Sequence, residues 1–238
     1  HFGTAKTDYG SDVSADAAGN VYVVGTTDAA FAGKINAGSN DAVVVKRDSK
    51  GEPVWITQFG TTLADSAVAV YADANGAVWV AGTSAGDMDG AGPGPLPAAG
   101  LTDVFVAKFD GATGKQLSMQ VYGSATRSES VIDMAYDKVA NRLVVLLNSG
   151  NTLGSGLSPD VIAVPLSTGI PAKLWSFIED GQNKNPTGIT VDSAGEIYIH
   201  GRSQWAISGA LSTTGTGGGG MYLYRVSSAG KTVWVQHW

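Results

Sequence analysis

A serine between glycines, at the spacing found in hydrolases, is the first group that could do chemistry. Residues 82–86, Gly-Thr-Ser-Ala-Gly, have the G-x-S-x-G pattern that places a nucleophilic serine on a sharp turn. That turn has to lie between a strand and a helix, and no helical apolar periodicity follows Ser84. An earlier segment, 25–28, has the similar sequence Gly-Thr-Thr-Asp, so a repeat accounts for Ser84. We therefore predict no catalytic residue and a protein that is not an enzyme.

Calcium binding by carboxylates is the second chemistry to consider. Asp87 and Asp89 alternate as at the start of a calcium loop, but Ala98 stands where such a loop needs its glutamate. A weak calcium site completed by backbone oxygens stays open, and a plain acidic loop is the interpretation that we favour. The chain has no cysteine, and its histidines form no pair at ligand spacing: His1, His200 and His237. We predict no metal centre and no cofactor, and we expect His200 to be half-buried in a strand.

These side chains belong to a sequence that repeats four times. Residues 65–83 read D-S-A-V-A-V-Y-A-D-A-N-G-A-V-W-V-A-G-T, and the pattern recurs around 8–26 and 189–201 and, more weakly, at 137–147. Each copy is followed by a second block and then a short apolar strand, and the second blocks begin at Asp41, Asp103, Asp160 and Gly220. Four repeats of about sixty residues account for all 238 residues.

Each repeat is predicted to form four short antiparallel strands. Its apolar segments are rich in Val, Ile, Tyr, Trp and Thr and are bounded by Gly, Asp, Asn and Ser. Segments 16–19, 73–76 and 192–195 begin with Asp and end with Gly, which is the chemistry of a tight hairpin turn. Such units in series are typical of a β-propeller or an open β-solenoid. We favour an all-β fold, a β-propeller with four blades of four antiparallel strands, because a ring protects its own edges.

The blades are assigned to residues 4–60, 61–123, 124–180 and 181–238 of a single propeller domain that covers residues 1–238. The chain opens with Phe2-Gly3-Thr4, the sequence with which the first closing strand ends at 59–61. Two interpretations fit this opening. Either the last blade docks on the first and closes a four-bladed ring, which we favour, or the chain is a segment of a longer array.

The repeat resembles a known family in its order of motifs. The succession W-x-x-x-F-G-T, D-S-A-x-A-V, D-x-x-G-x-V-W-V-A-G-T and D-x-F-V-A-K-F resembles the SBBP (beta-propeller) repeat of bacterial proteins, closely over 55–110 and nearly as well over 2–60. The later repeats depart from it, because Asp137 lacks its glycine partner and Gly220 replaces an aspartate. The resemblance implies a propeller, usually in secreted or cell-surface proteins. It implies no catalytic residues, since turns and core positions define the repeat.

Long inserts separate the second and third strands of each repeat, at 26–40, 83–102, 148–159 and 201–220. In a propeller these connections share one face, where loops vary and function is usually found. Trp205 has no counterpart in the other repeats, so we expect it to contact a partner or to cover the ring opening. The residues that we predict to bind a partner on this face are Phe31, Asp87, Asp89, Arg202 and Trp205.

Composition and charge limit the classes of function. A net charge of −6 argues against a protein that binds nucleic acid, and no apolar run reaches the roughly 18 residues of a membrane-spanning helix. We favour a non-enzymatic propeller, secreted or on the cell surface, that binds a protein or glycan partner through its long-loop face. One alternative is a structural or assembly module of a larger extracellular or filamentous protein. Another is a hydrolase or lyase with its site at the propeller mouth.

Overall fold

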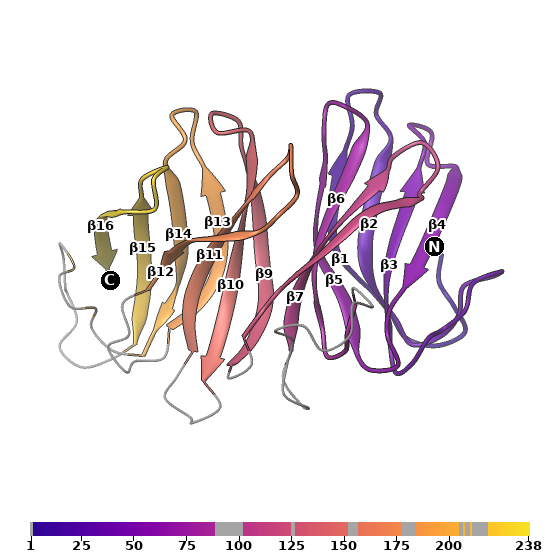
Figure 1. Ribbon diagram of the computed structural model, residues 1–238, viewed down its shortest axis with the longest axis horizontal. Helices are drawn as coiled ribbons and strands as arrows, with labels where there is room; N and C mark the ends of the chain where they lie inside the picture. The colour runs from indigo at the N-terminus through magenta and orange to yellow at the C-terminus, as the bar shows by residue number, and fades with distance from the viewer. Residues whose placement is uncertain are drawn as a thin grey trace. The chain divides into compact units, whose positions relative to one another are not determined.

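The computed structural model describes residues 2–88, 102–124, 127–151, 157–177, 184–204, 207, 210 and 219–238. Within these residues the chain forms 16 strands in four separate four-stranded antiparallel sheets (Figure 1). In each sheet the strands lie in chain order, as in the blades of a propeller. The predicted all-β propeller with four blades of four antiparallel strands is therefore confirmed. The described residues include no helix that is long and apolar enough to cross a membrane.

The sheets are numbered here in chain order. Sheet 1 holds β1 (Asp8–Ala15), β2 (Val21–Thr27), β3 (Asp41–Arg47) and β4 (Pro53–Phe59). Sheet 2 holds β5 (Asp65–Ala72), β6 (Ala77–Ser84), β7 (Asp103–Asp110) and β8 (Gln116–Tyr122). Sheet 3 holds β9 (Arg127–Asp137), β10 (Arg142–Asn151), β11 (Leu157–Pro165) and β12 (Ala172–Ser176). Sheet 4 holds β13 (Lys184–Val191), β14 (Ile197–Ser203), β15 (Gly220–Val226) and β16 (Thr232–His237).

Turn chemistry explains why consecutive strands pair. Three predicted hairpin turns end on a glycine with a left-handed backbone, namely Gly19, Gly76 and Gly195. In the first of these turns, the Asp16 carboxylate accepts the backbone N–H of Asn20 at 2.9 Å. In sheet 3 the turn runs from Asp137 to Asn141, and Asn141 takes the positive φ of 49°. Asparagine tolerates this conformation better than most residues, so the third repeat forms its turn without a glycine.

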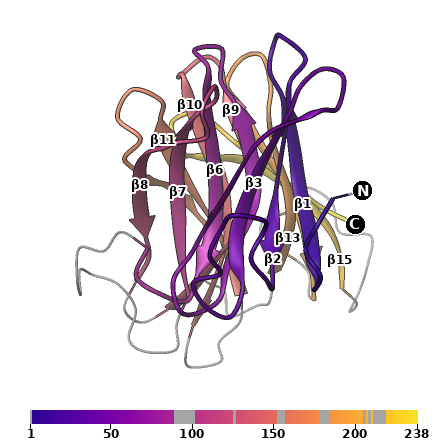
Figure 2. The same ribbon diagram turned by 90° about the vertical axis from the view of Figure 1, so that its right-hand side faces the viewer.

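Sheets 1 and 2 pack face to face in a compact unit that spans His1–Ala125 (Figure 2). In each unit, the side of the first sheet that packs on the second sheet is called the forward face, and the side of the second sheet in that contact is called the rear face. The same two names are used for the corresponding sides of every sheet. The forward face of sheet 1 and the rear face of sheet 2 share one core. In this core the Phe59 ring of β4 packs against Phe105 and Phe109 of β7, with ring centroids 5.6 and 5.3 Å apart.

A carboxylate also links the first strands of sheets 1 and 2. The pairing of β1 with β2 shifts by a bulge between Gly10 and Asp12. Past this bulge, Asp12 accepts the backbone N–H of Val70 in β5 at 2.9 Å. The bulge therefore directs one side chain of the first blade to the backbone of the second.

Sheets 3 and 4 repeat this packing in a second compact unit, Thr126–Trp238. Their shared core contains Leu146 and Trp175 from sheet 3 and Ile199 and Tyr224 from sheet 4. The carboxylate link recurs as well, because Asp133 of β9 accepts the backbone N–H of Ile189 in β13 at 2.9 Å. Each unit is thus a pair of blades that share an apolar core and a carboxylate link between their first strands.

The connections between second and third strands differ in length from the predicted inserts. They comprise residues 28–40, 85–102, 152–156 and 204–219. The third connection is shorter than the predicted 148–159, because β10 and β11 extend into that segment. Two expectations from the sequence are still predictions: that residues 1–238 form a single domain, and that its four blades have the bounds assigned above.

Candidate binding site at the end of sheet 4

Arg202 lies near the end of β14, between exposed residues of both neighbouring strands. It pairs with Asn185 of β13 and with Met221 of β15. Directly opposed residues in an antiparallel sheet point to the same side, so these three exposed side chains form a row on the forward face of sheet 4. Strand β14 thus presents Arg202, one of the predicted partner-binding residues, at the surface.

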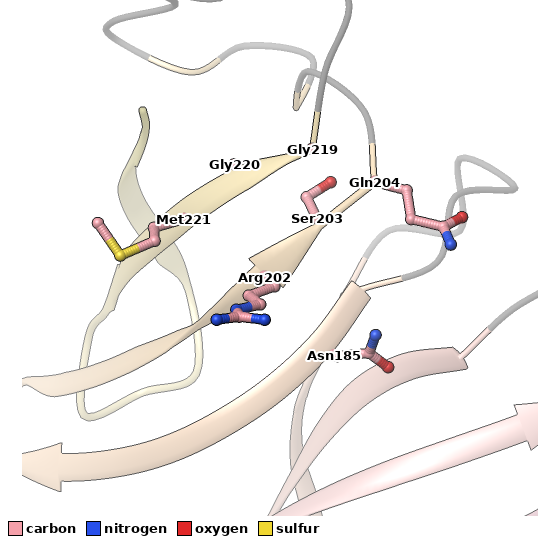
Figure 3. Close-up of a pocket in the computed structure, with 7 residues that line it drawn as sticks. All are labelled: Asn185, Arg202, Ser203, Gln204, Gly219, Gly220 and Met221. Carbon is pink, nitrogen blue, oxygen red and sulfur yellow. The ribbon is translucent and has the colours of Figure 1, made fainter.

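A pocket of about 430 Å³ opens at this row (Figure 3). The described residues that line it are Asn185, Arg202, Ser203, Gln204, Gly219, Gly220 and Met221. The Arg202 guanidinium supplies a cation with several N–H donors, while the amides of Asn185 and Gln204 supply donors and acceptors. The described lining contains no carboxylate, imidazole or thiol. Its groups suit the binding of a polar or anionic group, and they include no acid–base pair for proton transfer.

A glycine is required at the floor of this pocket. A side chain at Gly220 would clash with the carbonyl oxygen of Trp238. The backbones of Met221 and Trp238 exchange two hydrogen bonds, of 3.1 and 3.0 Å, which bring the end of the chain to this place. This close approach explains why the fourth repeat has glycine where the other repeats have aspartate.

The aspartates at the corresponding place in sheets 1 and 3 are buried and held by hydrogen bonds. Asp41 accepts a hydrogen bond from the Gln58 side chain at 2.9 Å. Asp160 accepts one from the Ser149 hydroxyl at 3.0 Å, and the Lys173 ammonium lies 3.4 Å from its carboxylate. These carboxylates fix the ends of neighbouring strands.

Asp103 of sheet 2 is the exception among these aspartates. Its side chain is 1% exposed, and neither carboxylate oxygen has a hydrogen-bond partner among the described residues. Burial raises the pKa of Asp103 to about 6. The nearby backbone amide of Ser124 acts in the opposite direction, but its effect on the pKa is smaller than that of burial, and its geometry is not that of a hydrogen bond. We therefore expect the stability of this sheet to depend on pH.

Ser84, the serine of the G-x-S-x-G segment, belongs to a structural network. It is the last residue of β6, it is buried, and its hydroxyl donates to the Asp65 carboxylate. The same hydroxyl accepts the backbone N–H of Gly86 at 2.9 Å, and Asp65 also accepts the backbone N–H of Thr61 at 2.5 Å. The chain continues from Ser84 into a bend rather than a helix. These contacts tie three strand ends together.

Phe31 lies in the core, contrary to the expectation that it binds a partner at the surface. Its side chain is 7% exposed and packs against Val43 and Val45 on the rear face of sheet 1. A hydrogen bond of 2.9 Å from the Phe31 backbone N–H to the Gln58 side chain holds the insert over this face. Because its ring is already covered, Phe31 is not available to a partner.

The other predicted residues have different outcomes. Asp87 is exposed just beyond β6, whereas Asp89 and Trp205 lie outside the described residues.

Among the residues that the structure describes, no three His, Cys, Asp or Glu side chains gather as a metal site would require. His200 is exposed rather than half-buried, because it lies on the exposed forward face of sheet 4, with Nδ1 2.9 Å from the Thr187 hydroxyl.

Sequence reasoning missed Asn185 and Met221, which complete the row around Arg202. The sequence carried a signal for one of them, because Tyr222, Tyr224 and Val226 recur at every second position. Tyr222, Tyr224 and Val226 are buried, so Met221 has to point to the other face. The neighbour on β13 could not be found in this way, because a bulge between Pro186 and Gly188 shifts the register.

Comparisons with protein sequences support the repeat and give no function. A family profile described as "Beta-propeller repeat" (SBBP) matches residues 2–32, which confirms the predicted resemblance. No curated protein matches the chain.

Two solved structures are similar to the chain at low sequence identity. One is a protein of unknown function from Dyadobacter fermentans DSM 18053, with 13% identity and a TM-score of 0.53 over 97% of this chain and 69% of that one. The other is a quinohemoprotein alcohol dehydrogenase from Pseudomonas putida HK5, with 12% identity and a TM-score of 0.37 over 92% of this chain and 52% of that one. The similarity to the Dyadobacter protein concerns the fold alone.

Proposed function

We propose that the chain is a non-enzymatic binding module of a secreted or cell-surface bacterial protein. The exposed forward face of sheet 4, together with its pocket, receives a partner protein in this proposal. The observation that carries it is the row of Asn185, Arg202 and Met221, which places a guanidinium between an amide and a thioether at the mouth of the pocket.

The breadth of this face supports a protein partner over a glycan. Trp238 lies opposite Met221, so the row continues across a fourth strand end. Met221 is 63% exposed and Trp238 is 47% exposed. Arginine, tryptophan and methionine are enriched in the contact surfaces of proteins, and tryptophan and arginine carry much of the binding energy there.

The proposed location is supported by the SBBP match at residues 2–32. An antibody against the chain should detect it in the medium or on intact cells of the organism that encodes it. Detection in the cytoplasm alone would contradict this part of the proposal.

The binding surface can be tested without knowing the natural partner. Random peptides displayed on phage are selected on the immobilised wild-type chain, and the selected peptides are then measured against variants. We expect Arg202→Ala to weaken the selected peptides about tenfold or more, because the guanidinium stands at the centre of the row.

Lys138→Ala is the matched control, since Lys138 is an exposed cation on a turn of the same unit. It should leave peptide binding unchanged. Selected peptides that bind equally well to Arg202→Ala would show that the surface lies elsewhere. A panel of neutral and uronic-acid oligosaccharides serves as the second probe, and binding of these sugars alone would contradict the protein partner.

A further inference from the structure

A groove of about 460 Å³ follows the free edge of sheet 1. Strand β4 is the last strand of this sheet, so only one of its two edges pairs with a neighbour, which is β3 (Figure 1). Five consecutive residues of β4, 53–57, line the groove. Successive side chains of a strand point to opposite faces, so a space that all five residues line has to lie beside the backbone. The groove therefore has the length and the direction of a strand.

The outward backbone groups of β4 are available to a partner. An edge strand presents N–H and C=O groups on the side where it has no neighbour. In the part of the chain that the structure describes, only β3 forms hydrogen bonds with the backbone of residues 53–57. Pro53 has no N–H, and Val54 lies at a bulge of the pairing with β3. A further strand would therefore pair with the part of β4 that follows these two residues.

The insert between β2 and β3 forms the rear wall of the groove. Phe31 of this insert is buried and packs against Ile56, whose side chain lies on the rear face of β4. The backbone N–H of Lys34 donates to the carbonyl oxygen of Phe31 at 2.8 Å, and Lys34 lines the groove. The insert that covers the rear face of sheet 1 thus also holds a cation beside its edge.

The turn after β7 forms the forward wall. The Thr57 hydroxyl donates to the carbonyl oxygen of Gly114 at 2.7 Å, and the Trp55 indole donates to that of Gly111 at 3.2 Å. A Cβ at Gly114 would lie 2.7 Å from the Trp55 ring, so the turn packs directly on β4. Lys115 follows Gly114 and lines the groove. One cation therefore stands on each side of the free edge.

The groove is positively charged, although the chain has a net charge of −6. Lys34 and Lys115 are both exposed, and the described lining contains no carboxylate. Glu52, which precedes β4, is not among the lining residues. Lysines beside an edge strand repel a second edge of the same kind, and they attract a strand that carries carboxylates. The charge of the groove therefore favours an acidic occupant.

We propose that the free edge of β4 binds an extended acidic segment of a partner protein as a fifth strand of sheet 1. The segment pairs with β4 through its backbone, and carboxylates on its two faces meet Lys34 on the rear wall and Lys115 on the forward wall. In this mode of recognition, main-chain hydrogen bonds give affinity and alternate side chains give specificity. The site is separate from the surface on sheet 4, because the described lining lies wholly in the first unit.

A synthetic peptide tests the proposal on the full chain. The probe is a capped, fluorescein-labelled, threonine-rich peptide of about nine residues with two glutamates three positions apart, which point to opposite faces of a strand. We expect saturable binding by fluorescence anisotropy, and a severalfold weakening when the salt rises from about 50 to about 500 mM. A peptide with lysine in place of both glutamates should not bind. Equal binding of the two peptides, or no saturation up to about 1 mM chain, would overturn the proposal.

Reversing the two cations locates the binding. Lys34→Glu combined with Lys115→Glu should weaken the acidic peptide about tenfold or more, because both of its carboxylates then meet like charges. The matched control combines Lys6→Glu with Lys138→Glu, which changes the net charge equally at exposed positions outside the groove. All four lysines are exposed, so thermal melting should show that both double variants stay folded. Equal weakening by the two pairs would show that net charge alone matters and would overturn the site.

N-methylated peptides test the backbone pairing. A strand that is added at an edge turns alternate N–H groups toward its neighbour and the others away from it. N-methylation of one alternate set should abolish binding, and N-methylation of the other set should preserve it. Two sets that behave alike would overturn the fifth strand. Inorganic phosphate at matched ionic strength should not displace the peptide, and displacement would show a site for small anions instead.

The groove and the surface on sheet 4 can be tested independently. Arg202→Ala should leave the binding of the acidic peptide unchanged, because Arg202 belongs to the second unit. Loss of binding in this variant would place the acidic peptide at the pocket of sheet 4. That result would overturn the groove and retain the function proposed for sheet 4.

Discussion

The ammonium group of Lys46 lies 2.7 Å from the carbonyl oxygen of Gly111, although the two residues belong to different blades. Lys46 is buried on β3, and the turn after β7 brings this oxygen to it. Burial of a charged group is costly unless a hydrogen bond compensates it, so this contact makes the cation acceptable in the core between sheets 1 and 2. It also fixes where one blade meets the next.

Replacing Lys46 should weaken the first unit. Lys46→Met keeps much of the side-chain volume and removes the ammonium, and we expect unfolding in urea to show a loss of about 2 kcal/mol. Lys6→Met is the control, because Lys6 is exposed, and it should change stability by less than about 0.5 kcal/mol. Equal stability of both variants would mean that the contact contributes nothing net.

Asp103 should make stability fall as the pH rises through its titration. Burial raises the pKa of Asp103 from 3.8 to about 6, so between these values the folded chain binds more protons than the unfolded chain. Stability contributed by the neutral carboxyl is fully present below pH 3.8 and is lost as the pH approaches and passes 6.

The variant Asp103→Asn isolates this effect. It imitates the neutral form, so it should be more stable than the wild-type chain by about 3 kcal/mol at pH 7, with little difference near pH 4. Urea unfolding of both chains across this range measures the difference. A difference that stays constant with pH would show that Asp103 does not titrate there.

Phe31→Ala should destabilise the chain by about 3 kcal/mol, since it leaves a cavity over Val43 and Val45. The same insert offers a matched control in Ile35, which is 83% exposed. Ile35→Ala should cost less than about 0.5 kcal/mol. Thermal or urea unfolding separates the two, and equal costs would place Phe31 at the surface after all.

Gly76→Ala should cost about 1 kcal/mol through backbone strain alone. The residue has a φ of +82°, and an added Cβ at this position meets no heavy atom within 4 Å. Gly76→Asn should cost less, because asparagine adopts the left-handed conformation more readily, as Asn141 does in the third repeat. Unfolding curves in which the two variants rank the other way would contradict this explanation.

The sequence was sufficient for features that depend on neighbouring residues. The turn at Asp16 could be predicted because its carboxylate bonds to the backbone only four residues ahead, at Asn20. The same local chemistry recurs at Asp73 and Asp192, and a repeated turn is enough to divide the chain into strands. The number of strands in each blade follows from these turns.

Features that depend on distant residues could not be predicted. Phe31 is held in the core by Gln58, which lies 27 residues away and carries no pattern that points back to the insert. The pocket beside Arg202 needs three strands in register, and the bulge before Gly188 changes which residue of β13 lies next to it. The expectation of a half-buried His200 failed for a similar reason, because alternation shows that a strand has two faces and does not show which face stays uncovered.

The carboxylate link between first strands joins sheet 1 to sheet 2 and sheet 3 to sheet 4. Asp12 and Asp133 follow the bulges of β1 and β9 and reach across to the backbones of Val70 and Ile189. The corresponding positions in β5 and β13 are Ala69 and Gly188, which have no side-chain oxygen. A carboxylate therefore helps to align the first strands inside each pair of blades, together with other hydrogen bonds between the blades, such as that of Lys46 with Gly111. Two consecutive blades are therefore the unit whose sheets align each other. Duplication or deletion of the sequence should be tolerated best in steps of about 120 residues, the length of two blades.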